Sequence, residues 1–188
     1  MRFDPLPTLA LAFYGVTFIA GKILLRGRRA KTKLDGGSLA AFDVSGVLTI
    51  PAGIVPGFTD YGRVRAFEPY VAAAGLALLA AGTALRWAAI RALWRYFTVN
   101  VSILEGQRVV RAGLYGVVRH PSYTGLLLRY LGFGLAFANW LSAALVFLPL
   151  LCATVCRIRV EEKALRAHFG GEYESYASVT KRLVPGIY

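Results

Sequence analysis

Residues 113–125 read Gly-Leu-Tyr-Gly-Val-Val-Arg-His-Pro-Ser-Tyr-Thr-Gly, and the most apolar run of the chain begins directly after them. The segment gathers Tyr115, Arg119, His120 and Tyr123 over a short distance, and its glycines and proline predict a turn rather than a continuous helix. Polar side chains beside a membrane segment indicate either a functional site or an interfacial loop with ordinary Arg and Tyr anchors. We expect a site, because ionisable clusters in or beside a membrane are rare and mostly functional.

The composition of the 188 residues is that of a membrane protein. Hydrophobic residues make up 56% and charged residues 17%, whereas soluble domains have about 45–50% apolar residues. We therefore predict an all-α, multi-pass integral membrane protein with a single domain over residues 1–188, divided into a three-helix part (1–95) and a catalytic part (96–188). The net charge of +12 lies at the ends of apolar runs, where it suits lipid headgroups. No nucleic-acid-binding signature is present, which argues against that partner.

Apolar runs predict about five membrane helices, since about 20 apolar residues cross a bilayer core. Asn139 and Trp140 separate the last two runs, so we expect these to form a hairpin of two short helices. The five predicted spans are 5–25, 38–58, 70–89, 123–138 and 141–156.

The sidedness follows from the basic residues. Residues 26–33 form the densest basic cluster, which predicts a cytoplasmic loop and an N-terminus outside. The polar segment 96–119 is expected to be a compact cytoplasmic loop folded onto the bundle, and the basic tail 157–188 also returns to the cytoplasm. The unusual polar residues of 100–120 and 157–176 then meet on one membrane face, which predicts a site facing the cytoplasm.

Two charged residues inside apolar runs are left without an assigned role. Arg129 costs about 3 kcal/mol in a membrane unless it is paired, so we expect it to face the bundle interior or a wet cavity, and a part in substrate binding is open. Asp43 belongs either at the interface or inside the bundle.

Common catalytic signatures are missing from the sequence. The two histidines, His120 and His168, with Glu161 and Glu162 match no metal-ligand spacing, and no nucleophile elbow, phosphate loop or dinucleotide fingerprint occurs. We therefore expect no metal. What remains suits the binding and alignment of polar ligands for group transfer from a preformed donor: Asn100, Tyr115, Arg119, His120, Tyr123, Arg157 and Glu161.

The motif G-x-Y-x-x-x-R-H-P-x-Y-x-G at 113–125, followed by Glu161-Glu162, F-G-x-x-Y-x-x-Y at 169–176 and R-x-x-P at 182–185, resembles the isoprenylcysteine carboxyl methyltransferase family. The resemblance covers roughly residues 97–185, and the chain is similar in size to the small prokaryotic members. Phospholipid N-methyltransferases and membrane sterol reductases share parts of the pattern, so it specifies the substrate less well than the superfamily.

The resemblance implies S-adenosyl-L-methionine in a cytoplasmic pocket formed by the loop before the hairpin and the C-terminal helices. Arg157 would hold the acceptor carboxylate and form the catalytic pair with Glu161, one helical turn away on the same face. Arginine suits a carboxylate because it can donate two parallel hydrogen bonds. By motif position the cofactor-binding residues would be Asn100, Gln107, Arg108, Val109, Val110, Tyr115, His120, Pro121, Ser122, Tyr123 and Glu161.

The reaction implied is methylation of the α-carboxylate of a prenylated cysteine or a similar lipophilic acceptor, which would reach the site sideways from the surrounding membrane lipids. A carboxylate is already deprotonated at pH 7, so no general base is required. The alternatives are a phospholipid or small-thiol methyltransferase, a non-enzymatic membrane protein, and a membrane NADPH-dependent reductase. The reductase is disfavoured by Leu126, where such relatives usually have an acidic residue. The physiological acceptor and the oligomeric state stay open.

Overall fold

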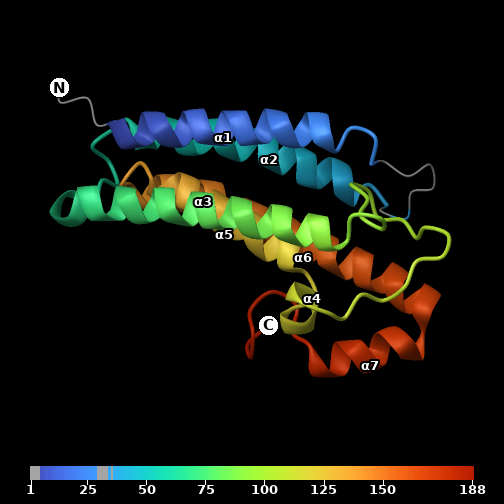
Figure 1. The fold of residues 1–188 in the computed structure, drawn as a ribbon. Coiled ribbons are helices and arrows are strands. Elements are labelled where there is room, and N and C mark those ends of the chain that lie inside the picture. The colour runs from blue at the N-terminus through green and yellow to red at the C-terminus, as the bar shows by residue number, and fades with distance from the viewer. Residues whose placement is uncertain (1–4, 29–33, 35) are drawn as a thin grey trace.

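The computed structural model describes residues 5–28, 34 and 36–188, in which the long helices lie side by side as a bundle (Figure 1). No strand occurs within these residues. The elements are α1 (Pro5–Leu24), α2 (Ser38–Gly57), η1 (Arg65–Phe67), α3 (Glu68–Ala92), α4 (Leu114–Val117), α5 (Pro121–Leu135), α6 (Trp140–Phe169) and α7 (Gly171–Val179).

Four helical segments of the described chain are long and apolar enough to cross a membrane: α1, α2, η1 with α3, and α6. Together they make the chain an integral membrane protein. The prediction of five spans is therefore confirmed for four. The fifth, α5, has 15 residues, and at about 1.5 Å per residue it is shorter than the roughly 30 Å bilayer core.

The chain breaks between α5 and α6 at the position predicted for the hairpin turn. The Asn139 side chain accepts hydrogen bonds from the backbone N–H groups of Leu141 and Ser142, which caps α6. The expected second short helix is wrong, however, because α6 continues for 30 residues to Phe169. The residues of α6 change from apolar to charged along the helix, but the helix continues without a break through this change. The helix ends where Gly170 adopts a positive φ of 51°.

Helices α3 and α5 pack antiparallel through glycines, and two of these glycines, Gly82 and Gly125, meet an arginine backbone on the other helix. A Cβ added to Gly82 would lie within 3.0 Å of the Arg129 backbone, and one added to Gly125 would lie within 3.0 Å of the Arg86 backbone. Such small residues let membrane helices approach closely. This reciprocal contact fixes the backbone positions of two buried or half-buried arginines.

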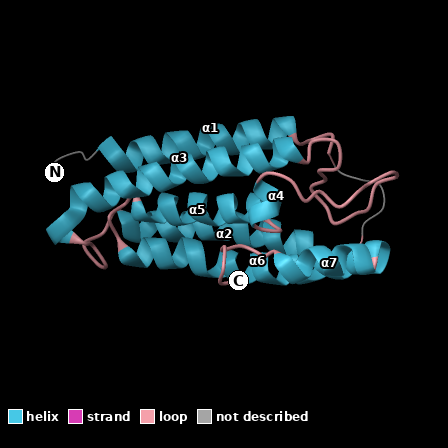
Figure 2. Ribbon diagram, turned by 60° about the horizontal axis from the view of Figure 1, so that its bottom comes forward, coloured by secondary structure: helices cyan, strands magenta, loops and turns pink. Residues whose placement is uncertain are grey.

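The long loop 93–113, α4, α7 and the C-terminal ends of α1 and α6 gather at one end of the bundle, away from the start of α1 (Figure 2). The Leu34 N–H donates to the Val101 carbonyl (2.9 Å) and the Val99 N–H to the Arg28 carbonyl (2.9 Å), so the loop is tied to the α1–α2 connection. The polar segments predicted to share one membrane face therefore do meet. The basic cluster 26–33 lies mostly outside the described residues, and its cytoplasmic placement stays a prediction.

Candidate active site

A cavity of about 520 Å³ opens where the long loop meets the helices, and it extends between α1, α2, α3, α5 and α6. Eleven of the twelve residues predicted for the site line it, while Pro121 is buried at the start of α5 and does not. The lining members are Asn100, Gln107, Arg108, Val109, Val110, Tyr115, His120, Ser122, Tyr123, Arg157 and Glu161. The structure thus brings together residues that are up to 61 positions apart, and their individual roles stay predictions.

Tyr123 links the predicted catalytic pair. Its hydroxyl donates to Glu161 Oε2 (2.8 Å) and accepts from Arg157 Nε (2.9 Å), so the arginine and the glutamate are connected through the tyrosine. Arg157 is buried and also donates to the Val99 carbonyl (2.5 Å), with a longer contact to Ser38 Oγ (3.4 Å). These contacts come from α2, α5 and the long loop, and they hold the guanidinium at the cavity wall.

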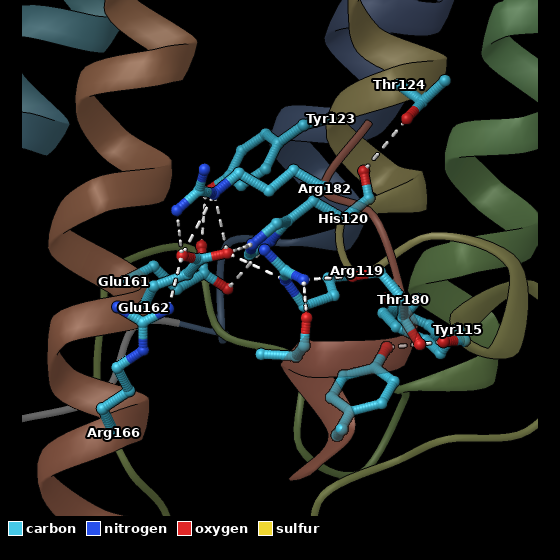
Figure 3. Close-up of polar contacts among 12 residues, drawn as sticks. Tyr115, Arg119, His120, Tyr123, Thr124, Glu161, Glu162, Arg166, Thr180 and Arg182 are labelled. Carbon is cyan, nitrogen blue, oxygen red and sulfur yellow. Dashed lines mark hydrogen bonds and ion pairs between the residues drawn. The ribbon is translucent and has the colours of Figure 1, made fainter. Parts of the chain in front are cut away.

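Glu162, next to Glu161 on α6, does not line the cavity and points into a cluster of basic side chains (Figure 3). Its carboxylate accepts from Arg119 Nε (3.0 Å) and from Arg182, with Nη2 at 2.8 Å and Nε at 3.1 Å. His120 Nε2 lies 3.4 Å away and Arg166 Nη2 3.6 Å away. The side chain of Glu162 is only 2% exposed, so these partners provide its solvation.

The cluster joins the tail to the motif of residues 113–125. Arg119 also donates to the backbone carbonyls of Ala177 and Thr180, and its own N–H donates to the Lys181 carbonyl (2.7 Å). The His120 N–H donates to the Arg182 carbonyl (3.0 Å). The C-terminal segment therefore packs directly behind the wall that carries His120.

Glu162 belongs to a motif of adjacent glutamates, and no role is predicted for it from the sequence. The adjacent glutamates could have indicated a separate role for Glu162. Neighbouring residues on a helix point about 100° apart, so only one of the two can face the cavity. Its partners were not readable, because Arg182 reaches Glu162 only through the turn that follows α7.

Three residues near the cavity, all outside the membrane-spanning helices, have pKa values shifted from their ordinary values. Burial, reinforced by the negative charge of Glu161, raises the pKa of Tyr115. Burial raises the pKa of Tyr176 to about 12, although Arg119 opposes the shift. Hydrogen bonding to Glu162 raises the pKa of Arg182. At neutral pH both tyrosines are hydroxyl donors and Arg182 is a cation.

The cavity wall is strongly positive. Seven Lys and Arg residues line it, against the two carboxylates of Asp43 and Glu161. Of the seven, Arg119 is paired with Glu162. Such a wall favours a ligand that carries an anionic group. The seven are Lys22, Arg26, Arg86, Arg108, Arg119, Arg129 and Arg157.

The two unassigned charged residues both belong to this wall. Arg129 is 6% exposed and faces the bundle interior at the cavity, as expected from its cost in a membrane. Asp43 lies in the second turn of α2 and also lines the cavity.

Known proteins with similar sequences point to one family. Residues 75–167 match the isoprenylcysteine carboxyl methyltransferase (ICMT) family, a match that begins upstream of the resemblance read from the motifs. A probable protein-S-isoprenylcysteine O-methyltransferase of Oryza sativa subsp. indica is 32% identical over 120 residues, which is 63% of this chain and 63% of the relative. Protein-S-isoprenylcysteine O-methyltransferase B of Arabidopsis thaliana is 33% identical over 115 residues, covering 60% of this chain and 58% of the relative.

The Schizosaccharomyces pombe protein-S-isoprenylcysteine O-methyltransferase is 37% identical over 79 residues, or 42% of this chain and 34% of the relative. The matched part therefore spans less than two thirds of each of these relatives. The family match, over residues 75–167, includes the motif of residues 113–125 and the helix face that carries Arg157 and Glu161. The family match and these relatives together support the isoprenylcysteine carboxyl methyltransferase family for this chain.

Proposed function

We propose that this chain is an S-adenosyl-L-methionine-dependent methyltransferase of the membrane, and that it methylates the α-carboxylate of a prenylated cysteine or a similar lipophilic acid. One observation carries the proposal: eleven residues chosen from the family motifs line a single cavity that extends between membrane helices. A cavity of this size lies within the roughly 300–1,000 Å³ range of small-molecule sites.

The residues at the loop end of the cavity fit the donor. Glu161 offers a carboxylate and Tyr115 and Tyr123 offer aromatic faces, which suit a cationic sulfonium ligand. Asn100 and Gln107 offer amides for polar groups of the same ligand. When bound, the donor supplies an electrophilic methyl carbon, on which an acceptor oxygen forms a bond while the carbon–sulfur bond breaks and its electron pair stays on sulfur.

Arg157 is the residue that would hold the acceptor carboxylate. Its long contact to Ser38 Oγ (3.4 Å) is the weakest of its hydrogen bonds, so a carboxylate can replace it at little cost. Tyr123 keeps the guanidinium next to Glu161, which would align acceptor and donor side by side. An amine acceptor, as in a phospholipid methyltransferase, would meet the excess of cations on this wall.

The proposal includes a cytoplasmic site, an N-terminus outside and a cytoplasmic C-terminus. It also includes access of the acceptor from the lipid phase, because the cavity is lined by residues of α1 and α2 within the membrane part of the bundle.

The test is a titration of S-adenosylhomocysteine against detergent-purified protein, followed by methyl transfer to prenylcysteine, phospholipid and thiol acceptors. We expect binding of the adenosyl ligand and transfer to prenylcysteine. Arg157→Ala should lower kcat/KM by roughly 100-fold, given about 1.5–3 kcal/mol for each hydrogen bond to a charged group. Arg159→Ala is the matched control, because Arg159 lies on the same helix but is exposed outside the cavity.

An absence of adenosyl-ligand binding would overturn the proposal. Equal rates for wild type, Arg157→Ala and Glu161→Ala would overturn the two residue roles while leaving the activity in place.

A further inference from the structure

Arg129 lies deep in the membrane part of the cavity. It is in the middle of α5, is 6% exposed, and contacts α1 at Tyr14 and Thr17. Tyr14 lies at the centre of the 20-residue α1, about 14–15 Å from either helix end at 1.5 Å per residue, and Thr17 lies about 10 Å from the C-terminal end. The guanidinium is therefore held near mid-membrane depth, where a charge needs a partner.

Its protein partners leave donors unused. Arg129 Nη2 donates to the Tyr14 carbonyl (3.2 Å) and to Thr17 Oγ1 (3.0 Å), and the guanidinium carbon lies 4.5 Å from the centroid of the Tyr14 ring. Neither Nε nor Nη1 has an acceptor among the residues that the structure describes. All the atoms that solvate this cation are uncharged, so its positive charge is not neutralised by these contacts.

A second cation and a spare hydroxyl proton face the same region. Arg86 lies on α3, which packs against α5, and it also lines the cavity. Its Nη1 group donates to the carbonyl and the hydroxyl of Ser122, and its positive charge repels that of Arg129. Within the described chain, neither arginine lies within 4.0 Å of a carboxylate. The hydroxyls of Tyr14 and Tyr130 share one hydrogen bond (2.8 Å), so one of their two protons is left to donate, and Tyr130 lines the cavity.

We propose that this mid-membrane end of the cavity is an oxyanion subsite, and that the acceptor carries a second acidic group on its apolar body, which Arg129 and Tyr130 bind. The inference rests on the proposed function for the position of the first carboxylate at Arg157. A plain hydrocarbon tail would surround Arg129 with apolar groups and leave its charge uncompensated. An oxyanion accepts from the free guanidinium donors and offsets the charge of Arg129. Within the class of lipophilic acids proposed above, the preferred substrate is thus one that carries a second acidic group on its apolar body.

A binding experiment tests the subsite without any turnover. Detergent-purified protein is titrated with α,ω-dicarboxylic acids of increasing chain length and with their monomethyl esters. We expect the best-fitting diacid to bind the wild type at least about tenfold more tightly than its ester, as a hydrogen-bonded charge would give. Arg129→Met should remove this preference, and Arg129→Lys should keep part of it.

The controls separate a lost subsite from a lost fold. Arg91→Met removes a cation from an exposed position of α3 outside the cavity, and it should keep the wild-type preference. Arg129→Gln retains hydrogen bonding without charge, and it serves if Arg129→Met does not fold. Equal binding of diacid and ester by the wild type, or the same preference in Arg129→Met and wild type, would overturn the inference.

Methyl transfer then distinguishes this inference from the proposed function. Prenylcysteine with a hydrocarbon tail is compared with the same compound bearing a carboxylate at the tail end. A higher kcat/KM for the acidic tail, lost in Arg129→Met, supports both statements. Transfer to both compounds with equal kcat/KM in wild type overturns the subsite and leaves the methyltransferase in place. Diacid preference without any transfer overturns the methyltransferase and leaves the subsite.

Discussion

Glu162→Gln should release the C-terminal segment from the wall of the cavity. The substitution keeps the size of the side chain and removes the charge that receives hydrogen bonds from Arg119 and Arg182 at 2.8–3.1 Å. Breaking a buried pair by removing one partner costs about 3–5 kcal/mol. We therefore expect local opening of this segment to become about 140- to 3,700-fold more frequent, at about 1.4 kcal/mol per factor of ten.

Amide hydrogen exchange measures this opening directly. The N–H groups of Arg119 and His120 donate to the carbonyls of Lys181 and Arg182, so their protection reports whether the segment is docked. Protection of these two amides should fall by the factor above, while amides in the middle of α3 keep their wild-type protection.

The matched control is Glu172→Gln. Glu172 also pairs with an arginine, at 3.5 Å, but the two side chains are 53% and 44% exposed, and exposed pairs contribute about 0–1 kcal/mol. Its effect on the same amides should be within about fivefold. If Glu162→Gln leaves their protection within the same limit, the cluster does not anchor the tail and our reasoning about it fails.

Three further perturbations follow from other contacts. Tyr123→Phe removes the hydroxyl that links the catalytic pair, and it should lower kcat/KM of methyl transfer by about tenfold or more; Tyr173→Phe, whose hydroxyl has no partner in the described chain, should leave thermal stability unchanged or higher. Gly82→Ala forces a Cβ into the α5 backbone and should lower the unfolding temperature in detergent, whereas Gly15→Ala meets nothing within 4 Å and should not; equal shifts would refute the packing argument. The pKa of Tyr176 is raised by burial to about 12, so the folded state keeps a proton that the unfolded state loses above its ordinary value near 10. Stability should fall as the pH rises from about 10 to 12, and Tyr176→Phe should reduce that slope in unfolding measurements.

Helix positions were largely predictable because membrane spans are defined by composition. The expected span 38–58 became Ser38–Gly57, and the expected 5–25 became Pro5–Leu24. The end of α5 was not predictable to the same accuracy. Residues 136–138 are as apolar as the helix before them, yet they form the turn, and Ala138 adopts a positive φ of 47° that no propensity of alanine favours.

The candidate site was predictable as a set but not as a set of contacts. Motif spacing grouped residues of the long loop with Arg157 and Glu161, and the cavity contains them. Whether Tyr123 would bridge that pair depends on how α5 and α6 cross, which one sequence does not reveal. The depth of Arg129 was readable from its apolar surroundings, whereas its contacts on α1 required the packed bundle.

The unbroken course of α6 couples the site to the thickness of the bilayer. Its 30 residues extend about 45 Å, some 15 Å more than a bilayer core, and both Arg157 and Glu161 lie on the portion beyond the apolar half. A helix that tilts to match a thinner membrane moves everything rigidly attached to it. In this protein α6 contacts the lipid along its apolar half and carries Arg157 and Glu161 on its other half. The thickness of the membrane therefore sets the height and the tilt of the site relative to the acyl chains.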